Sequence, residues 1–217
     1  MKTYNIIGGV NGVGKSSFTG VLKGTRRDLG IIIDVDKITA DLGGNMIKGG
    51  RAAVEKIRDC LKRGISFTQE TTLSGHMTAQ TAKKARDAGY SICMYYIAID
   101  TAQESILRIE NRVKRGGHDI AQQDVLRRFA SRWSDLQEVL PYCDRAEFYD
   151  NGNGFVKVAE YQNGELLPIG NKRPQWLDEL LLAWDPDFTK LTPKERRELE
   201  EAENDPETNP FDEIDWT

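Results

Sequence analysis

The sequence lacks any apolar run of the roughly 20 residues that a membrane-spanning helix needs, so it predicts no transmembrane protein. Its first residues, MKTYNIIGGV, pass into glycines after a few apolar positions, without the pattern of a secretion signal. Cysteine is scarce, and Cys60, Cys93 and Cys143 share no CxxC spacing, which argues against a disulfide framework and a zinc ribbon. These absences predict a cytoplasmic protein with buried or idle thiols.

A strong excess of basic residues is also missing. The formal net charge is -4, and residues 194–217 hold ten acidic and three basic residues, so this stretch carries -7 and the remainder +3. Nucleic-acid binding usually requires a strongly basic face. We therefore expect a phosphorylated small molecule as ligand, and neither a nucleic acid nor a membrane as partner.

Apolar runs rich in branched and aromatic residues alternate with helical stretches, which is typical of a mostly parallel sheet wrapped by helices in an α/β fold. The patterns predict strands at residues 4–7, 31–34, 65–70, 91–99 and 146–149. Helices are predicted at residues 15–26, 51–63, 76–88, 101–114 and 121–139. A hairpin with an Asn163-Gly164 turn is predicted over residues 154–169.

The length of 217 residues suits one α/β core. We expect a single domain over residues 1–185. Residues 186–217 are punctuated by prolines and contain TPKERRELEEAEN, which resembles a charged helix with little to bury. This acidic stretch is expected to be an appendage of the domain.

One motif carries specific chemistry. The string GVNGVGKS at residues 9–16 matches the phosphate-binding loop GxxxxGK[ST], and it lies between a predicted strand and a predicted helix. Glycines let successive backbone N–H groups point at phosphates, and the helix N-terminus adds a positive dipole. Lys15 would reach the β- and γ-phosphates and Ser16 would bind Mg²⁺. The expected nucleotide-binding residues are Asn11, Gly12, Val13, Gly14, Lys15, Ser16 and Ser17; the alternative is an ordinary glycine-rich turn.

Missing motifs narrow the class of nucleotide enzyme. A small GTPase would carry NKxD, whereas the nearest string, residues 171–174, reads NKRP. Motor-type ATPases usually show a long apolar strand that ends in Asp-Glu, and no predicted strand of this sequence ends in that pair. The remaining acidic strand ends favour a small-molecule kinase that uses ATP and Mg²⁺.

Those acidic strand ends are Asp34-Val35-Asp36 and Glu70. Ligands of open α/β sheets bind at the carboxyl ends of the strands, so both should face the phosphate-binding loop. In an extended segment Asp34 and Asp36 would point the same way, one toward Mg²⁺ and its water, the other toward a substrate hydroxyl. Alternatively, one of them caps a following helix. Glu70, at a buried strand end, needs a metal or substrate partner.

Residues 108–132 carry many arginines on two predicted helices joined by Gly116-Gly117, which resembles the lid of a nucleotide or sugar kinase. Arg112 and Arg115, next to the glycines, are the expected catalytic arginines of the lid. The alternative is a solvated helical face, which should hold for at least half of these residues.

Taken together, the chain resembles the zeta toxin family, the kinase half of epsilon/zeta and PezAT toxin–antitoxin pairs. The resemblance covers about residues 4–150 and rests on GVNGVGKSS, IIIDVDKI, GISFTQETTLSG, SICMYYIAID and NRVKRGGHDI in this order. It implies transfer of the γ-phosphoryl group of ATP to the 3′-hydroxyl of UDP-N-acetylglucosamine, and a protein antitoxin as partner.

The resemblance also implies roles for residues near the acceptor. Asp36 would be the general base, supported by Asp34, and Glu70 and Thr72 would contact the sugar nucleotide. Asp34 is in addition a candidate metal ligand.

On the nucleotide side, the resemblance assigns Lys15 and Ser16 to ATP and Mg²⁺. Arg112 and Arg115 would clamp the phosphates, and Asn151 would lie at the adenine pocket.

Two segments depart from that family. Where it commonly carries arginines, this chain has Lys37-Ile38-Thr39-Ala40 and Ser74-Gly75, which removes cations expected near the acceptor. Two alternatives to the nucleotide-sugar kinase therefore stay open. One is another small-molecule or antibiotic kinase of the same fold, and the other is an ATP-binding regulatory switch with little turnover.

Overall fold

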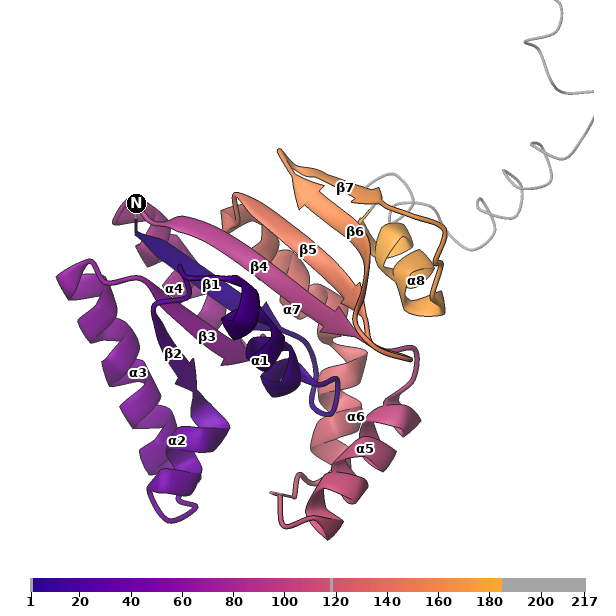
Figure 1. The fold of residues 1–217 in the computed structure, drawn as a ribbon, viewed down its shortest axis with the longest axis horizontal. Coiled ribbons are helices and arrows are strands. Elements are labelled where there is room, and N and C mark those ends of the chain that lie inside the picture. The colour runs from indigo at the N-terminus through magenta and orange to yellow at the C-terminus, as the bar shows by residue number, and fades with distance from the viewer. Residues whose placement is uncertain (1, 118, 185–217) are drawn as a thin grey trace, which may run out of the picture. The chain divides into compact units, whose positions relative to one another are not determined.

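The computed structural model describes residues 2–117 and 119–184 (Figure 1). Its strands are β1 Thr3–Gly8, β2 Ile31–Asp34, β3 Phe67–Thr71, β4 Ser91–Ala98, β5 Arg145–Asp150, β6 Val156–Gln162 and β7 Glu165–Pro168. Its α-helices are α1 Lys15–Thr25, α2 Val35–Asp41, α3 Met46–Arg63, α4 Met77–Asp87, α5 Ala102–Lys114, α6 Gln122–Ala130, α7 Arg132–Val139 and α8 Gln175–Trp184. A short 3₁₀ turn, η1 Leu140–Tyr142, follows α7.

The described strands form one sheet in the order β2-β3-β1-β4-β5-β6-β7. The first five strands in this order pair in parallel, and β6 and β7 extend the sheet by antiparallel pairing. Because β1 lies between β3 and β4, the loop after β1 opens among the carboxyl ends of three parallel strands. Ligands bind at such ends in open α/β sheets.

Side chains alternate between the two faces of the sheet, and helices cover both faces (Figure 1). On one face, Ile7 and Tyr95 belong to a buried cluster with Phe18 of α1. On the other face, the ring of Tyr96 lies 5.9 Å from that of Trp133 of α7, and the Tyr4 and Phe67 rings stack at 4.4 Å. Each face thus has its own apolar core, and the mostly parallel α/β architecture is confirmed.

The predicted strands match the observed ones to within two residues at each end. The hairpin is also confirmed, because β6 and β7 pair in antiparallel register around Asn163 and Gly164. Both turn residues have positive φ, 56° and 90°, as a two-residue hairpin turn requires. The three cysteines are free and buried, as expected.

Two helix predictions were wrong. Helix α3 begins at Met46 instead of residue 51, because the side chain of Asn45 caps it by accepting a hydrogen bond from Lys48 N at 3.0 Å. Gly49 disfavours a helix in the sequence pattern, which is why residues 46–50 were not predicted as helical. In the structure this position requires glycine, because a Cβ there would lie 2.0 Å from Thr39 Oγ1. The single helix predicted over residues 121–139 is two helices in the structure, α6 and α7, which are separated at Ser131. The hydroxyl of Ser131 donates a hydrogen bond to Asp135 Oδ2 at 2.8 Å.

The chain divides into two compact units, Met1–Asp178 and a second that begins at Glu179. The acidic appendage predicted at residues 186–217 lies outside the described residues. Among the residues that the structure describes, no helix is long and apolar enough to span a bilayer.

Candidate active site

The loop after β1 has the geometry of a phosphate-binding loop. Gly12 and Gly14 have φ angles of 80° and 93°, which L-residues with a side chain rarely adopt. A Cβ on Gly12 would lie 2.6 Å from the carbonyl oxygen of Ser105, so this position tolerates only glycine. Helix α1 begins directly afterwards at Lys15, which places its N-terminus at the loop. The backbone therefore presents N–H groups and a helix dipole to one point.

Lys15 folds over this loop. Its Nζ donates hydrogen bonds to the carbonyl oxygens of Gly9 and Val10, both at 2.9 Å. Burial lowers the pKa of Lys15 to about 8, and attraction from Asp36 and Glu70 opposes this shift. The lysine is therefore a cation near neutral pH, and its charge is sensitive to the carboxylates around it.

Glu70 joins the end of β3 to the start of α1. Its carboxylate accepts hydrogen bonds from Ser16 Oγ at 2.7 Å and Thr19 Oγ1 at 2.6 Å. Parallel pairing places Glu70 beside Ile7, one residue before the end of β1. Burial raises the pKa of Glu70, and the two hydroxyl donors oppose that rise. The Glu70 carboxylate thus lies directly beside the Ser16 hydroxyl, on the same side of the site.

The segment after β2 differs from the extended one that the sequence predicted. Helix α2 begins at Val35, and Asp34 is its N-cap, with Oδ1 accepting from the backbone N of Asp36 at 3.0 Å and of Lys37 at 3.2 Å. The prediction of an extended segment through Asp36 was wrong, because capping these N–H groups starts a helix at once, although both carboxylates still line one cavity. The capping alternative holds for Asp34, and Asp36 lies in the first helical turn.

The lid arginines make distinct contacts. Arg108 donates through Nη2 to the carbonyl oxygen of Asn151 at 2.6 Å. Arg128 on α6 donates through Nη1 to Asn11 Oδ1 at 2.7 Å, so it reaches the phosphate-binding loop directly. Its Nε is buried without a hydrogen-bond partner. Arg128 was not predicted as a site residue, because no local pattern in the sequence distinguishes it from the neighbouring exposed Arg127.

Asn151 follows β5 and fixes the loop from the other side. Its Nδ2 donates to the carbonyl oxygen of Val13 at 2.8 Å. The preceding residue, Asp150, is 2% exposed and accepts from Trp176 Nε1 at 2.9 Å. Asp150 also forms an ion pair with Lys172 at 2.5 Å. The Gly152 backbone N donates to the same carboxylate at 3.2 Å, so a buried carboxylate with three partners holds the strand end that carries Asn151.

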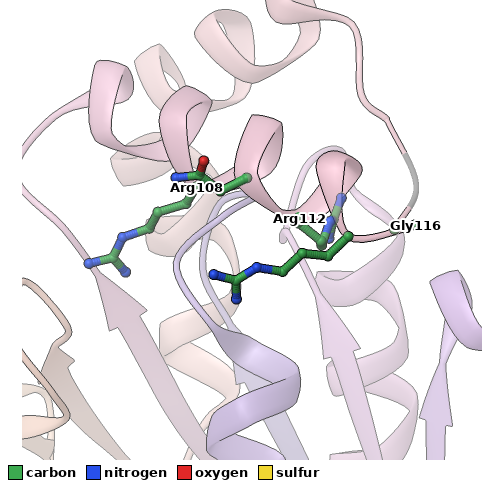
Figure 2. Close-up of a pocket in the computed structure, with 6 residues that line it drawn as sticks. Arg108, Arg112 and Gly116 are labelled. Carbon is green, nitrogen blue, oxygen red and sulfur yellow. The ribbon is translucent and has the colours of Figure 1, made fainter.

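One cavity of about 760 Å³ gathers most of the predicted site. Its wall includes the predicted residues Asn11, Gly12, Gly14, Lys15, Ser16, Ser17, Asp34, Asp36, Glu70, Thr72 and Arg112. Val13 and Asn151 do not line it. Val13 is buried in the core, and the Asn151 side chain donates a hydrogen bond to the Val13 carbonyl oxygen. Arg115 lines a separate opening of about 590 Å³ along α5, together with Arg108 and Arg112 (Figure 2).

Comparison with solved structures defines the class of fold. A chain of the PezAT chromosomal toxin–antitoxin system of Streptococcus pneumoniae aligns with a TM-score of 0.57 at 18% identity, covering 94% of this chain and 85% of that one. A chain of the AvrRxo1-ORF1:-ORF2 crystal structure with ATP aligns with a TM-score of 0.62 at 14% identity. That match covers 85% of this chain and 64% of the other, so this chain spans less than two thirds of its length. The fold is therefore a zeta-toxin-like P-loop kinase fold.

Sequence comparison gives the family. No family model matches the chain. An uncharacterized protein of Haemophilus influenzae (strain Rd) is 35% identical over 127 residues, which cover 56% of this chain and 88% of that protein. The chain belongs to the same family as this Haemophilus protein.

Proposed function

We propose that this protein is an ATP-dependent kinase that transfers the γ-phosphoryl group to an alcohol hydroxyl of a small molecule. The observation that supports this most is the single cavity whose wall includes Lys15, Ser16, Asp36 and Arg112. Phosphate binding, metal binding, acceptor activation and charge neutralisation are the four parts that phosphoryl transfer needs. The fold shared with the chain from the AvrRxo1-ORF1:-ORF2 crystal structure with ATP adds support for the nucleotide.

In this proposal, the nucleotide binds across the loop after β1. Its β- and γ-phosphates accept hydrogen bonds from the loop N–H groups, and Lys15 exchanges its carbonyl partners for phosphate oxygens. Arg112 and Arg128 neutralise the charge that develops on the transferred group. The adenine lies toward Asn151, next to the contact of Arg108 with the Asn151 carbonyl.

Mg²⁺ fits the residues beside the loop. The Ser16 hydroxyl and the Glu70 carboxylate lie 2.7 Å apart, and both are hard oxygen ligands. The described residues include no cluster of three or more metal-ligating side chains, which agrees with a metal that is held mainly by phosphates and water. Ser16 and Glu70 would hold Mg²⁺, with Asp34 near it, and the ion would polarise the phosphoryl oxygens.

Asp36 is proposed as the general base. It lines the same cavity as Lys15, and it lies close enough to raise the pKa of that lysine. The acceptor hydroxyl gives its proton to the Asp36 carboxylate while its oxygen bonds to the γ-phosphorus. The bond from that phosphorus to the β–γ bridging oxygen breaks, and ADP leaves. The resemblance to zeta toxins makes the 3′-hydroxyl of UDP-N-acetylglucosamine the first acceptor to assay, with Thr72 beside it.

The test is an intact-mass assay of products from Mg-ATP with UDP-sugars and free sugars, run on the wild type, Asp36→Asn and Lys15→Ala. We expect a product heavier by one phosphoryl group in the wild type, no product in either variant, and normal ATP binding in Asp36→Asn. ATP binding with unchanged behaviour of Asp36→Asn in every assay would contradict the kinase and favour a nucleotide-dependent switch. The cytoplasm, where ATP is abundant, is the proposed location.

A protein partner is part of the proposal. The description of the Streptococcus structure as a toxin–antitoxin system supports an antitoxin-like protein that blocks the cavity. Inhibition of phosphoryl transfer by a co-purified partner, relieved by excess ATP, would support it. Partner binding with full activity would contradict it.

A further inference from the structure

The strand order divides the wall of the 760 Å³ cavity into two halves. Strands β2 and β3 lie on one side of β1, and β4 and β5 lie on the other. Accordingly, α2 and α3 lie on one side of the phosphate-binding loop and α5 and α6 on the other (Figure 1). We call the lining residues within 34–46 and 70–72 the acceptor wall, and those within 11–17 and 108–128 the nucleotide wall.

The charges of the two walls differ. The charged members of the acceptor wall are all carboxylates, namely Asp34, Asp36 and Glu70. Every lysine and arginine that lines the cavity in the described part of the chain belongs to the nucleotide wall, namely Lys15, Arg108, Arg112 and Arg128. Two of these cations are held there by hydrogen bonds, Lys15 to the loop carbonyls and Arg128 to Asn11.

The remaining acceptor wall is uncharged. Thr39, Thr71 and Thr72 line it with hydroxyl-bearing side chains, and Gly44 leaves space at its outer end. Met46 adds an apolar surface and is 77% exposed. Such a wall can form hydrogen bonds with hydroxyl groups and pack against an apolar carbon skeleton. This wall has no cation that could bind a second set of phosphates. Desolvation of those phosphates, and their repulsion by Asp34 and Asp36, would disfavour their binding.

We propose that the phosphoryl acceptor is a phosphate-free hydroxyl compound with no net negative charge, of which an amino sugar or amino alcohol is the best fit. The inference rests on the proposed kinase function and names the substrate class of the same site. A protonated amine on the acceptor gains from the carboxylates of the acceptor wall, and its hydroxyl meets Asp36. A nucleotide sugar would bring its diphosphate to the half of the cavity whose wall has carboxylates and no lysine or arginine.

The experiment separates acceptors by charge before their identity is known. A small-molecule extract of bacterial cells is passed over an anion exchanger, and the unretained and retained fractions are each incubated with full-length protein, Mg²⁺ and γ-labelled ATP. The same incubations with Asp36→Asn give the background. We expect at least about ten times more Asp36-dependent product from the unretained fraction.

Each other outcome counts against the inference. Product mainly from the retained fraction, or efficient phosphorylation of purified UDP-N-acetylglucosamine, would overturn the acceptor class and leave the kinase standing. Transfer in neither fraction would overturn the kinase itself, and the acceptor class with it.

A second variant tests the role of the acceptor wall. Asp34→Asn removes one charge but keeps a good N-cap for α2, because asparagine caps about as well as aspartate. We expect the ratio of product from unretained to retained acceptors to fall about tenfold, whatever the change in the total rate. Asp41→Asn, at the other end of α2 and outside the cavity, is the matched control. Equal ratios in the two variants would contradict the inference.

Discussion

Glu70→Gln removes a buried negative charge from the end of β3, beside the phosphate-binding loop, while keeping the shape of the side chain. Glu70 is 7% exposed, and its two oxygens accept hydrogen bonds from the hydroxyls of Ser16 and Thr19. A glutamine has one acceptor oxygen and one donor group, and a hydroxyl can rotate to donate or accept. Both contacts can therefore persist in the variant, and only the charge is lost.

The magnitudes follow from burial and from these two bonds. Because burial raises the pKa of Glu70, the folded protein bears a cost for the charge that glutamine does not bear. We expect the free energy of unfolding of Glu70→Gln to lie within about 1 kcal/mol of the wild type. Glu70→Ala loses both bonds and leaves unfilled space, so it should lose about 2 to 4 kcal/mol. Function should respond differently, with a 10- to 100-fold loss of Mg²⁺-dependent activity in Glu70→Gln, about the loss expected on removing a metal's hydrogen-bonded support.

Urea unfolding and ATP titrations with and without Mg²⁺ separate these effects. The glutamine variant should unfold near the wild-type midpoint and bind metal-free ATP at least as well, because a charge that repels phosphate is gone. Its gain in ATP affinity on adding Mg²⁺ should shrink. A glutamine variant with the full wild-type gain would refute the reasoning that Glu70 supports the metal.

Four further predictions address the other parts of the site. Lys15 has a pKa of about 8 against an ordinary 10.5, so ATP affinity should fall as the pH rises above about 8 and stay flat below about 7, as isothermal titration would show. The unfolded chain binds more protons on Lys15 across this interval, so the free energy of unfolding of the wild type relative to Lys15→Met should rise from about pH 8 to 10.5. Arg128→Lys should lower kcat about 100-fold, while Arg127→Lys, on the exposed side of the same helix, should change it less than about twofold; equal effects would remove the role of Arg128. Trp176→Phe deletes the hydrogen bond to Asp150, so it should lower the free energy of unfolding by about 1 kcal/mol. It should also raise the KM for ATP about threefold and leave kcat unchanged. An unchanged KM would show that the strand end does not need this hydrogen bond.

Much of the fold, and the nucleotide half of the site, could be predicted from short stretches of sequence. The strand after Met1, the glycines and the start of α1 at Lys15 are encoded within about 20 consecutive residues, and the structure has them where the motif predicts them. The Asn163-Gly164 hairpin is equally local, because two residues with positive φ define the turn. The start of α3 was not predicted, although asparagine is a common N-cap residue and Asn45 caps this helix. The reason is that Gly49 and Gly50, which disfavour helices, follow it closely.

The sequence by itself determined the phosphate-binding loop, the alternation of strands and helices, and the residue types at the strand ends. Only the tertiary structure decided which of these residues meet. Ser16 and Glu70 are 54 positions apart and Asn11 and Arg128 are 117 apart, and parallel strand pairing and the α5–α6 lid join them. Asp34 is an N-cap because the first four backbone N–H groups of a helix lack intrahelical partners, and its carboxylate accepts hydrogen bonds from two of them. Hydrogen bonds within a segment can be read along the chain, whereas contacts between segments depend on the strand order that packing selects.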